Sequence, residues 1–560
     1  MQLRLLISVI STFSLFGNEV YALWPIPRTL QTGTSFVKLS PDFGITVNVN
    51  NPPQDLLDAV SRTKAYIQTD KLQRLTVGRG ANDSSAIRSA PMLAELRVSL
   101  NSGSTVRPIA DESVRPLAQR VEGYSLTVPS NGSAAVLTAN STLGLFRGLT
   151  TFQQLWYDLS GVTYSYQVPV VISNDTPAFP YRGFMLDTAR NFFPVDDIKR
   201  TFDAMSLVKI NTFHWHIVDS HSFPLQVDQF PEVSQQGAYS SDEVYTPVDI
   251  QDIVSYAGER GIDVLVEIDT PGHTAAIASS HPEHIACNQA SPWGNFANEP
   301  PAGQLRLASA ATTQFIASLI SSVAKTLPST LFSTGGDEIN SNCYAKDAQT
   351  QSDLSASGRT LEQALNVFTQ ATHKSLTDLG KSPVVWEEMV LSHNVTLPAS
   401  TVVLVWISSA NAASVARKGF KLVHAPSDYF YLDCGAGEWI GNTVGATSWC
   451  DPFKSWQKAY TFDPYANIPS SQRSLVLGGQ QLLWTEQSSP ENLDSIVWPR
   501  AATSAEVFWT GATLPDGTPR NGNTALPRLH DIRYRMVNRG IEAIALQPHW
   551  CALRPGACNS

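Results

Sequence analysis

Two adjacent carboxylates, Asp337 and Glu338, follow an apolar run and two glycines in the segment 331–340. Neighbouring side chains of a regular strand point to opposite faces, so these two can share a site only if the strand ends before them. Gly335 and Gly336 permit such a change of direction, because glycine adopts backbone angles that other residues avoid. Paired carboxylates can cleave a glycosidic bond when one protonates the leaving oxygen and the other stabilises positive charge. Taken alone, the pair is more simply a solvated acidic turn.

Short apolar strands alternate with helix-length segments after Tyr181, and this pattern predicts the framework that holds the carboxylates. The predicted strands are 184–189, 212–218, 263–269, 331–335, 383–387, 402–407, 421–425 and 475–483. The helices between them include 195–208, 249–260, 311–326 and 361–379. Eight such units closed into a ring form an α/β fold of the (β/α)8 TIM barrel type. An open doubly wound sheet is the alternative, but no Gly-x-Gly-x-x-Gly motif supports dinucleotide binding.

The residues before the barrel, 23–178, alternate predicted helices and strands without obvious chemistry. We interpret them as a smaller α+β domain that packs on the barrel. Its predicted helices are 56–70 and 144–156, and its predicted strands are 96–100, 123–128 and 134–139. Pro177 and Pro180 mark the boundary, which leaves residues 179–560 for the barrel and a C-terminal tail. The last barrel helix is expected over 525–539.

Residues 1–22 have the pattern of a secretory signal peptide. A basic start precedes an apolar run from Leu5 to Phe16, which is too short to span a bilayer, and no later run is long enough either. Five N-glycosylation sequons agree with a secreted, extracellular protein or one of a vacuolar or lysosome-like compartment. They begin at Asn82, Asn131, Asn140, Asn174 and Asn394.

Six cysteines in a secreted chain predict three disulfides. Their order favours the local pairs Cys287–Cys343, Cys434–Cys450 and Cys551–Cys558. Other connectivities and free buried thiols are the alternatives. The chain has no Cys-x-x-Cys motif, which argues against a zinc site built from cysteines.

Composition bounds the class of protein. A chain of 560 residues exceeds the size of one ordinary core, and 42% hydrophobic with 16% charged residues is typical of a globular fold. The net charge of -10 argues against a nucleic-acid partner, and no basic patch with interleaved aromatic residues is present.

Polar and aromatic residues gather at the predicted carboxyl ends of the strands, where barrels carry their chemistry. Besides the adjacent carboxylates, the set comprises Arg190, Asp219, His273, Trp386, Trp406, Tyr431, Asp433, Trp484 and Glu486. Aromatic faces cover sugar rings while Arg, Asp and Glu bind hydroxyls, so the set predicts a site for a neutral polyhydroxyl ring. Singly, each tryptophan is more often a core residue, and the arginine could form a surface ion pair.

Two histidine patterns raise the question of a metal. His214 and His216 alternate on one predicted strand, but no third ligand is evident, and we interpret them as structural. The segment 281–284 reads His-Pro-Glu-His, which matches no zinc-protease motif, and its proline disfavours a helix. We therefore predict no metal site, and no organic cofactor is implied.

Taken in order, these motifs resemble the β-N-acetylhexosaminidases of glycoside hydrolase family 20, in particular secreted fungal members, over nearly the whole mature chain. The resemblance lies in the segments 183–190, 214–219, 269–273 and 335–338. It implies an exo-acting hydrolase that releases terminal GlcNAc or GalNAc from chitooligosaccharides or glycans with retention. The acetamido oxygen of the substrate itself would attack the anomeric carbon, an exception to the two-carboxylate scheme. Related enzymes often form homodimers, so a homodimer is expected.

The resemblance also implies a role for each matched residue. Glu338 corresponds to the general acid and base, and Asp337 to the residue that orients the acetamido group. The remaining matches are Arg190, Glu486 and Asp433 at the sugar hydroxyls, Trp386, Trp406 and Trp484 around the ring, Tyr431 at the acetamido oxygen, and Asp219 with His273 as a polar relay. Because the acid must be protonated at the working pH, we expect apolar neighbours to raise the pKa of Glu338 while Asp337 stays ionised. An acidic pH optimum follows.

Two competing functions are left open by the sequence. A non-catalytic carbohydrate-binding barrel would keep the aromatic residues, although such proteins typically lose the acid. A classical retaining glycosidase would need a carboxylate nucleophile about 5–5.5 Å from the acid, for which Glu387 and Glu486 are candidates. An absolute requirement for a 2-acetamido group would exclude the second alternative.

Overall fold

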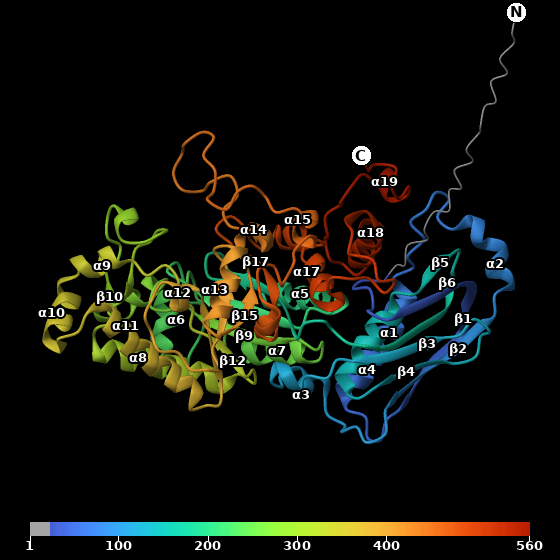
Figure 1. Cartoon of the computed structure of the whole chain (residues 1–560), viewed down its shortest axis with the longest axis horizontal. Coiled ribbons are helices and arrows are strands. Elements are labelled where there is room, and N and C mark those ends of the chain that lie inside the picture. The colour runs from blue at the N-terminus through green and yellow to red at the C-terminus, as the bar shows by residue number, and fades with distance from the viewer. Residues whose placement is uncertain (1–22, 560) are drawn as a thin grey trace, which may run out of the picture.

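The computed structural model describes residues 23–559, so the predicted signal peptide lies outside the described residues. Figure 1 shows a sheet with its covering helices beside a larger unit of helices around a central sheet. No helix of residues 23–559 is long and apolar enough to cross a membrane.

The larger unit is a closed barrel of eight parallel strands. Its strands are β7 (Tyr181–Asp187), β8 (Thr212–Val218), β9 (Asp263–Ile268), β12 (Leu331–Ser333), β13 (Ser382–Trp386), β14 (Val402–Val405), β15 (Lys421–His424) and β17 (Val476–Leu483). They pair in sequence order, and β17 closes the ring by pairing with both β15 and β7. The predicted barrel is confirmed, and all eight predicted strand positions fall on these strands.

The outer layer of the barrel is made of helices that begin at recognisable caps. Its longer helices are α5 (Val195–Leu207), α7 (Pro247–Gly258), α8 (Ala310–Thr326), α11 (Leu361–Thr377), α17 (Ala502–Thr510) and α18 (Gly522–Asn538). Thr246 and Asp249 form a capping box at the start of α7, and Thr360 with Gln363 does the same for α11. Shorter helices, α12 (Glu388–Leu391) and α13 (Ala412–Arg417), follow β13 and β14. The ring of helices is therefore uneven.

The N-terminal unit is a six-stranded mixed sheet covered by helices. Its strands are β1 (Leu30–Asn48), β2 (Met92–Leu100), β3 (Tyr124–Val128), β4 (Ala135–Ala139), β5 (Tyr157–Leu159) and β6 (Val162–Asp175), in the order β1-β2-β4-β3-β6-β5. Its main helices are α1 (Gln54–Thr69) and α4 (Thr142–Gln153). The sequence analysis did not predict β1 and β6, the two longest strands of this sheet.

Helix α4 lies between the sheet and the barrel, and every one of its residues is buried. From α4, Arg147 Nη2 donates to the carbonyl of Gly261 over 2.7 Å. Glu122 accepts hydrogen bonds from Arg147 Nε at 2.9 Å and from Arg182 Nη2 of β7 at 2.5 Å. Burial alone would raise the pKa of Glu122, but the two guanidinium groups outweigh it and lower the pKa to about 2. This buried ion cluster joins the two units.

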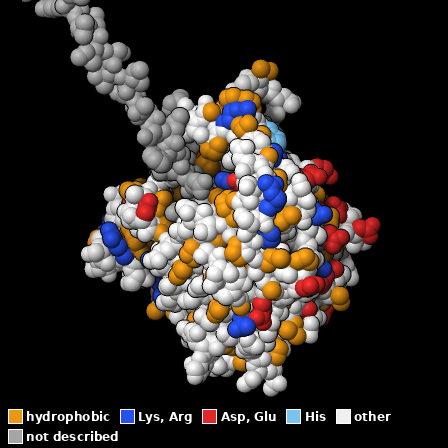
Figure 2. Space-filling model, turned by 90° about the vertical axis from the view of Figure 1, so that its right-hand side faces the viewer, with side chains coloured by type: hydrophobic (Ala, Val, Ile, Leu, Met, Phe, Trp, Pro, Cys, Tyr) orange, Lys and Arg blue, Asp and Glu red, His pale blue; other side chains and the backbone are white. Residues whose placement is uncertain are grey.

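Three disulfides, Cys287–Cys343, Cys434–Cys450 and Cys551–Cys558, follow the local pairing expected from the sequence. Disulfides persist in oxidising compartments, so they are consistent with a protein of the secretory pathway. The five sequon asparagines are all exposed, and their glycosylation stays a prediction. Figure 2 shows the face at the N-terminal sheet, where the Lys and Arg side chains lie scattered among hydrophobic ones and acidic side chains gather at one edge.

The ion cluster generates a stability prediction. Glu122→Ala should lower the free energy of unfolding by about 3–5 kcal/mol, because it leaves two buried guanidinium groups without their carboxylate. The loss should be present at neutral pH and shrink as the pH falls from the ordinary pKa of Glu toward about 2. Urea unfolding followed by fluorescence measures it. As a control, Asp378→Ala removes an exposed partner of Lys374 and should cost no more than about 0.5 kcal/mol; equal losses would contradict the assignment.

Candidate active site

The strand that precedes the two adjacent carboxylates ends at Ser333, so the chain can turn before them. Gly335 and Gly336 have φ angles of 66° and 106°, and Glu338 adopts φ 53°, a region that residues other than glycine rarely use. A side chain at Gly335 would overlap Asp269 of the neighbouring strand end. The N–H of Gly336 donates to Asp269 Oδ1 over 2.9 Å. The turn therefore depends on both glycines and on this carboxylate.

Asp337 is buried beside a second carboxylate. Asp337 is 7% exposed, and its oxygen lies within 4.8 Å of both an oxygen of Asp269 and a ring nitrogen of His273. Asp337 Oδ1 and Asp269 Oδ2 are buried without a hydrogen-bond partner among the described residues. Burial and the charge of Asp269 raise the pKa of Asp337 well above its ordinary value. A single proton held by this pair would satisfy both carboxyl groups.

Glu338 is partly buried, with its side chain 24% exposed. Its Oε2 lies 3.3 Å from Nε2 of His273, and Nδ1 of His273 lies 3.2 Å from Oδ1 of Asp219. Burial would raise the pKa of Glu338, but the hydrogen bond and the charge of His273 outweigh it and lower the pKa. Burial likewise opposes the charge on His273, yet Asp219 and Glu338 raise its pKa well above the ordinary value. Both shifts favour the proton of this pair on His273.

These directions correct the electrostatic expectation for the two adjacent carboxylates. The sequence analysis expected a raised pKa for Glu338 and an ionised Asp337, whereas the structure lowers the pKa of Glu338 and raises that of Asp337. The physical reason is the identity of the nearest neighbours. A cationic imidazole, His273, contacts Glu338 where apolar aromatic rings were expected, and Asp269 lies beside Asp337.

The polar contacts continue from Asp219 into the barrel interior. Asp219 Oδ2 lies 2.8 Å from Nε2 of His216, whose Nδ1 lies 2.6 Å from Oε1 of Glu267. The other oxygen of Glu267 lies 3.1 Å from His214 Nε2. Although burial disfavours its charge, hydrogen bonds to the two carboxylates raise the pKa of His216 to about 10. His214 and His216 therefore act as internal structural partners that fix Asp219 and, through it, His273.

Arg190 is held by several carboxylates at the end of β7. Its Nη1 lies 2.8 Å from Asp219 and 3.4 Å from Asp187, and its Nε donates to Glu299 Oε1 over 3.0 Å. The guanidinium carbon lies 5.0 Å from the ring centre of Trp484. Burial opposes the charge, but these carboxylates raise the pKa of Arg190 well above its ordinary value. Arg190 is thus a cation that its carboxylate partners hold in place within the candidate site.

Two further predicted carboxylates lie near the ends of β17 and of β16 (Tyr431–Asp433). Glu486 Oε2 is buried with no hydrogen-bond partner among the described residues, and burial raises the pKa of Glu486 to about 8 although Arg190 opposes this. Asp433 accepts two backbone N–H groups of its own loop at 2.8 and 3.0 Å and the hydroxyl of Ser488 at 2.8 Å. Glu486 Oε2 is therefore available to accept a hydrogen bond from a bound sugar, whereas the hydrogen bonds of Asp433 hold its own loop.

Aromatic side chains line the same end of the barrel. Trp386 is fully buried and lies 6.1 Å from Trp484 between ring centres. Trp406 stacks on Tyr431 with centres 6.4 Å apart and planes 10° from parallel. Trp449, 63% exposed, contacts both of these rings edge-on from the disulfide-closed loop 434–450. The four predicted aromatic residues therefore form one connected wall, and Trp449 extends it to the surface.

The sequence analysis assigned no role to several residues of this site. They are Asp187, Asp269, Glu299, Glu388 and Trp449. The first two stand at strand ends, within the matched segments 183–190 and 269–273, but the motifs alone did not indicate what they contact. Glu388 accepts from Nε1 of Trp406 at 2.9 and 3.0 Å, and burial raises its pKa to about 7. Glu299 and Trp449 lie on long loops, where no periodic signal indicates position.

The fold and the site together define a glycoside hydrolase. An eight-stranded barrel presents adjacent carboxylates, a fixed arginine and an aromatic wall at the carboxyl ends of its strands, which suits an oligosaccharide rather than a nucleotide or a nucleic acid.

Comparison with known proteins identifies the family. Residues 179–512 match the model of the glycosyl hydrolase family 20 catalytic domain, and residues 23–155 match a model described as beta-acetyl hexosaminidase like. A beta-hexosaminidase of Arthroderma benhamiae is 36% identical over 78% of this chain and 74% of its own length. A chitooligosaccharidolytic beta-N-acetylglucosaminidase of Bombyx mori is 32% identical over 97% of this chain and 90% of its own. Among solved structures, the chitobiase of Flavobacterium johnsoniae aligns with a TM-score of 0.73 at 25% identity, covering 93% of this chain and 73% of the other.

The chain belongs to glycosyl hydrolase family 20 and has the β-N-acetylhexosaminidase activity of that family. The family predicted from the sequence motifs is thereby confirmed.

The Asp269–Asp337 contact generates a pH-dependent stability prediction. The pKa of Asp337 is raised in the folded protein, so folding favours its protonated form, and wild type loses stability as the pH rises from the ordinary value of Asp toward the folded one. Asp337→Asn is neutral at every pH. It should raise the free energy of unfolding at pH 7, by about 1.4 kcal/mol for each tenfold difference between the folded and unfolded ionisation constants of Asp337. This gain should vanish near pH 4.

Thermal unfolding of wild type and Asp337→Asn at both pH values measures this gain. Asp378→Asn, which alters an exposed carboxylate, should change neither melting temperature. A variant that is less stable than wild type at pH 7, or equally shifted at both pH values, would contradict a raised pKa.

Proposed function

We propose that the protein is an exo-acting β-N-acetylhexosaminidase that removes terminal GlcNAc or GalNAc from chitooligosaccharides or glycans by substrate-assisted, retaining catalysis. Glu338 is the general acid and then the general base, and Asp337 orients the acetamido group and stabilises its charge. The observation that carries the proposal is the chain of contacts from Glu338 through His273 to Asp219. These contacts give Glu338 a proton donor, His273, and leave Asp337 buried beside Asp269.

Proton movement in this arrangement follows from the neighbours of Glu338. Nε2 of His273, which can carry the proton, lies 3.3 Å from Glu338 Oε2. A sugar bound over Glu338 would displace water from it, which disfavours its charged form and draws the proton toward it. The protonated carboxyl can then donate to the leaving glycosidic oxygen, and the returned carboxylate can activate water in the second step. Asp219 retains His273 in the required orientation throughout.

The acetamido group would meet the buried half of the site. The positive charge that develops on the acetamido nitrogen during attack favours an ionised Asp337, and the proton that Asp337 gives up can pass to Asp269 beside it. Tyr431 lies in the aromatic wall, 6.3 Å from Trp484 between ring centres. We assign its hydroxyl to the acetamido oxygen, and Trp386, Trp406 and Trp484 to the faces of the acetamido group and the ring. Substrate hydroxyls are assigned to Arg190, Glu486 and Asp433.

The two-carboxylate alternative has weaker physical support. Glu387 is fully buried, accepts from Asn411 at 2.7 Å, and has its pKa raised to about 7 by burial. Burial raises the pKa of Glu486 to about 8. A carboxyl that holds its proton at neutral pH is a poor nucleophile. A non-catalytic carbohydrate-binding barrel would not need the His273–Glu338 contact. Forming that contact costs free energy, because it buries charged groups.

The substrate range follows the same observations. The aromatic wall and the exposed Trp449 would suit a further sugar ring on the leaving side. The Bombyx mori relative carries a name that denotes action on chitooligosaccharides. We therefore favour chitooligosaccharides as substrates, with glycan termini as the second class.

A paired-substrate assay tests the proposal. The protein should hydrolyse an aryl β-N-acetylglucosaminide and leave the matching aryl β-glucoside intact, because only the first carries the attacking acetamido oxygen. Glu338→Gln should slow the first reaction by about 10²–10⁴-fold, the usual contribution of a general acid and base. NMR of the first-formed product should show the β-anomer.

Comparable hydrolysis of the glucoside would contradict substrate assistance and favour the two-carboxylate mechanism. Sugar binding without hydrolysis of either compound would make the barrel a carbohydrate-binding module. Glu387→Gln serves as the matched control, because it changes a neighbouring buried carboxyl and should leave hydrolysis of the acetamido sugar within a few-fold of wild type; a loss equal to that of Glu338→Gln would revive it as a nucleophile.

A further inference from the structure

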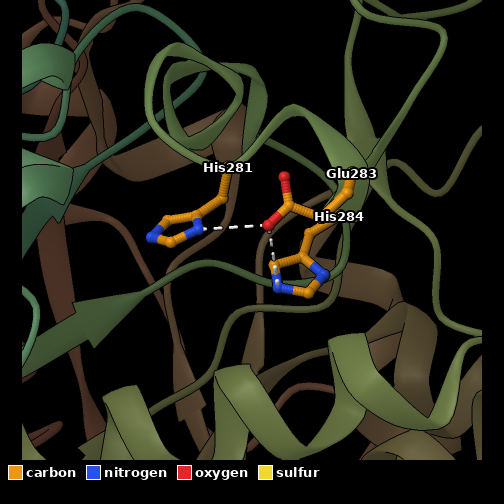
Figure 3. A group of neighbouring side chains, drawn as sticks. All are labelled: His281, Glu283 and His284. Atoms are coloured by element: carbon orange, nitrogen blue, oxygen red, sulfur yellow. Dashed lines mark hydrogen bonds and ion pairs between the residues drawn. The ribbon is translucent and has the colours of Figure 1, made fainter.

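The segment 281–284 places two imidazoles and a carboxylate together away from the catalytic carboxylates. Glu283 Oε1 lies 3.3 Å from Nδ1 of His281 and 3.9 Å from Nε2 of His284, and the three ligand atoms all lie within 4.8 Å of one another. Figure 3 shows both rings directed at the same oxygen of Glu283. The sequence analysis had set this segment aside because its proline disfavours an α-helix.

A 3₁₀ turn that contains Pro282 aligns the rings of His281 and His284. Residues Pro282–His284 form the 3₁₀ turn η4, in which His284 N–H donates to the carbonyl of His281 over 3.1 Å. In a 3₁₀ turn, side chains at positions i and i+3 lie one above the other. The ring planes of His281 and His284 are 29° from parallel, with centres 5.8 Å apart. The i, i+4 spacing of α-helical zinc motifs is therefore not required here.

Each ring nitrogen that faces away from Glu283 has its own hydrogen-bond partner. Nε2 of His281 lies 3.0 Å from Oε1 of Glu232 on α6 (Pro231–Gly237). Nδ1 of His284 lies 3.0 Å from the hydroxyl of Thr312 on α8. Metal-binding histidines almost always donate their second ring N–H to a carboxylate or another oxygen in this way, which fixes the ring and directs the free lone pair at the metal.

The rings are further held by packing. The ring of Phe315 lies 4.7 Å from that of His281 and 4.6 Å from that of His284 between centres. Arg306 donates to the carbonyl of Glu283 over 2.8 Å, and its charge is taken up by Asp347. The backbone and both rings are thus fixed without any ion.

We infer that His281, Glu283 and His284 form a binding site for a divalent transition-metal ion of the zinc class, with water in the remaining position. Two imidazoles and one carboxylate are a ligand set that zinc accepts in tetrahedral geometry, with metal–ligand distances of about 2.0–2.2 Å. Ligand atoms around such an ion are about 3.3–3.5 Å apart. The 3.3 Å contact to His281 already meets this spacing, and a shift of about 0.5 Å brings the 3.9 Å contact to His284 to it.

The site lies on the connection between β9 and α8, where a bound metal would add a crosslink within the segment 281–284. That connection carries His273 and Glu299 of the catalytic site, and the metal would join it to α6 through the Glu232 contact. His281 and Glu283 are 22% and 61% exposed in their side chains, which leaves the ion a path from solvent.

Zinc binding to the full chain tests the inference. After chelator treatment, isothermal titration with Zn²⁺ in the presence of saturating GlcNAc, which occupies the catalytic carboxylates, should give one zinc per chain, and zinc should raise the melting temperature. His281→Gln and Glu283→Gln should each weaken binding at least tenfold, and Glu232→Gln by about 10–100-fold through loss of the contact that orients His281. Co²⁺ in place of zinc should give the intense visible bands of four-coordinate cobalt in wild type only.

The matched control is His393→Gln. His393 pairs with a single carboxylate, Glu362, at 3.0 Å, so this variant should bind zinc as wild type does. Because none of these side chains belongs to the catalytic site, metal-free variants should keep wild-type hydrolysis, which shows that they are folded. Wild type that binds no zinc at micromolar concentration, or His281→Gln and Glu283→Gln variants that bind it as tightly as wild type, would overturn the inference.

Discussion

The hydrogen bond from the N–H of Gly336 to Asp269 is the contact on which the catalytic end of the barrel depends. It joins the end of β12 to the end of β9 and holds the chain in positive-φ conformations at both glycines and at Glu338. Without this turn, the two carboxylates would point to opposite faces of a strand. With it, Asp337 enters the protein interior beside Asp269 and Glu338 faces His273. One backbone contact therefore gives adjacent residues of similar chemistry two different surroundings.

Those surroundings determine where the protons lie before substrate binds. Burial and a like charge raise the pKa of Asp337 and favour its protonated form, whereas His273 lowers the pKa of Glu338 and favours its ionised form. A bound sugar that excludes water from Glu338 would favour its protonated form, and the positive charge that develops on the acetamido nitrogen during attack would favour an ionised Asp337. On this account the proton that Glu338 must donate lies next to it, on His273. The buried network from Asp219 to Glu267 keeps that donor in place.

Strong local patterns made the barrel predictable from sequence. Strands buried on both faces read as short apolar runs, and the glycines before Asp337 indicated where one of them stops. The N-terminal sheet was harder to predict from the sequence, because β1 contains a register shift between Leu39 and Gly44 that interrupts the alternation of its side chains. The residues of the site could be collected because they stand at strand ends. Their protonation could not, because it depends on contacts such as His273–Glu338 that join segments distant in sequence.

The same limit explains the histidine turn. The residues 281–284 match no helical zinc motif, and only the 3₁₀ geometry together with Glu232 and Thr312 gives the rings a common direction. Motifs of this kind are recognised through partners supplied by other elements of the fold.

Leaving-group dependence tests the central claim, the division of labour between Glu338 and Asp337, most directly. Rates would be measured for aryl β-N-acetylglucosaminides whose phenols span a range of acidity, in wild type, Glu338→Gln and Asp337→Asn. A leaving group that departs without protonation does not need the acid, so the defect of Glu338→Gln should shrink for the most acidic phenols. The defect of Asp337→Asn should stay constant across the series, because attack by the acetamido oxygen is required for every substrate. Equal dependence on the leaving group in both variants, or the reverse assignment, would contradict the account.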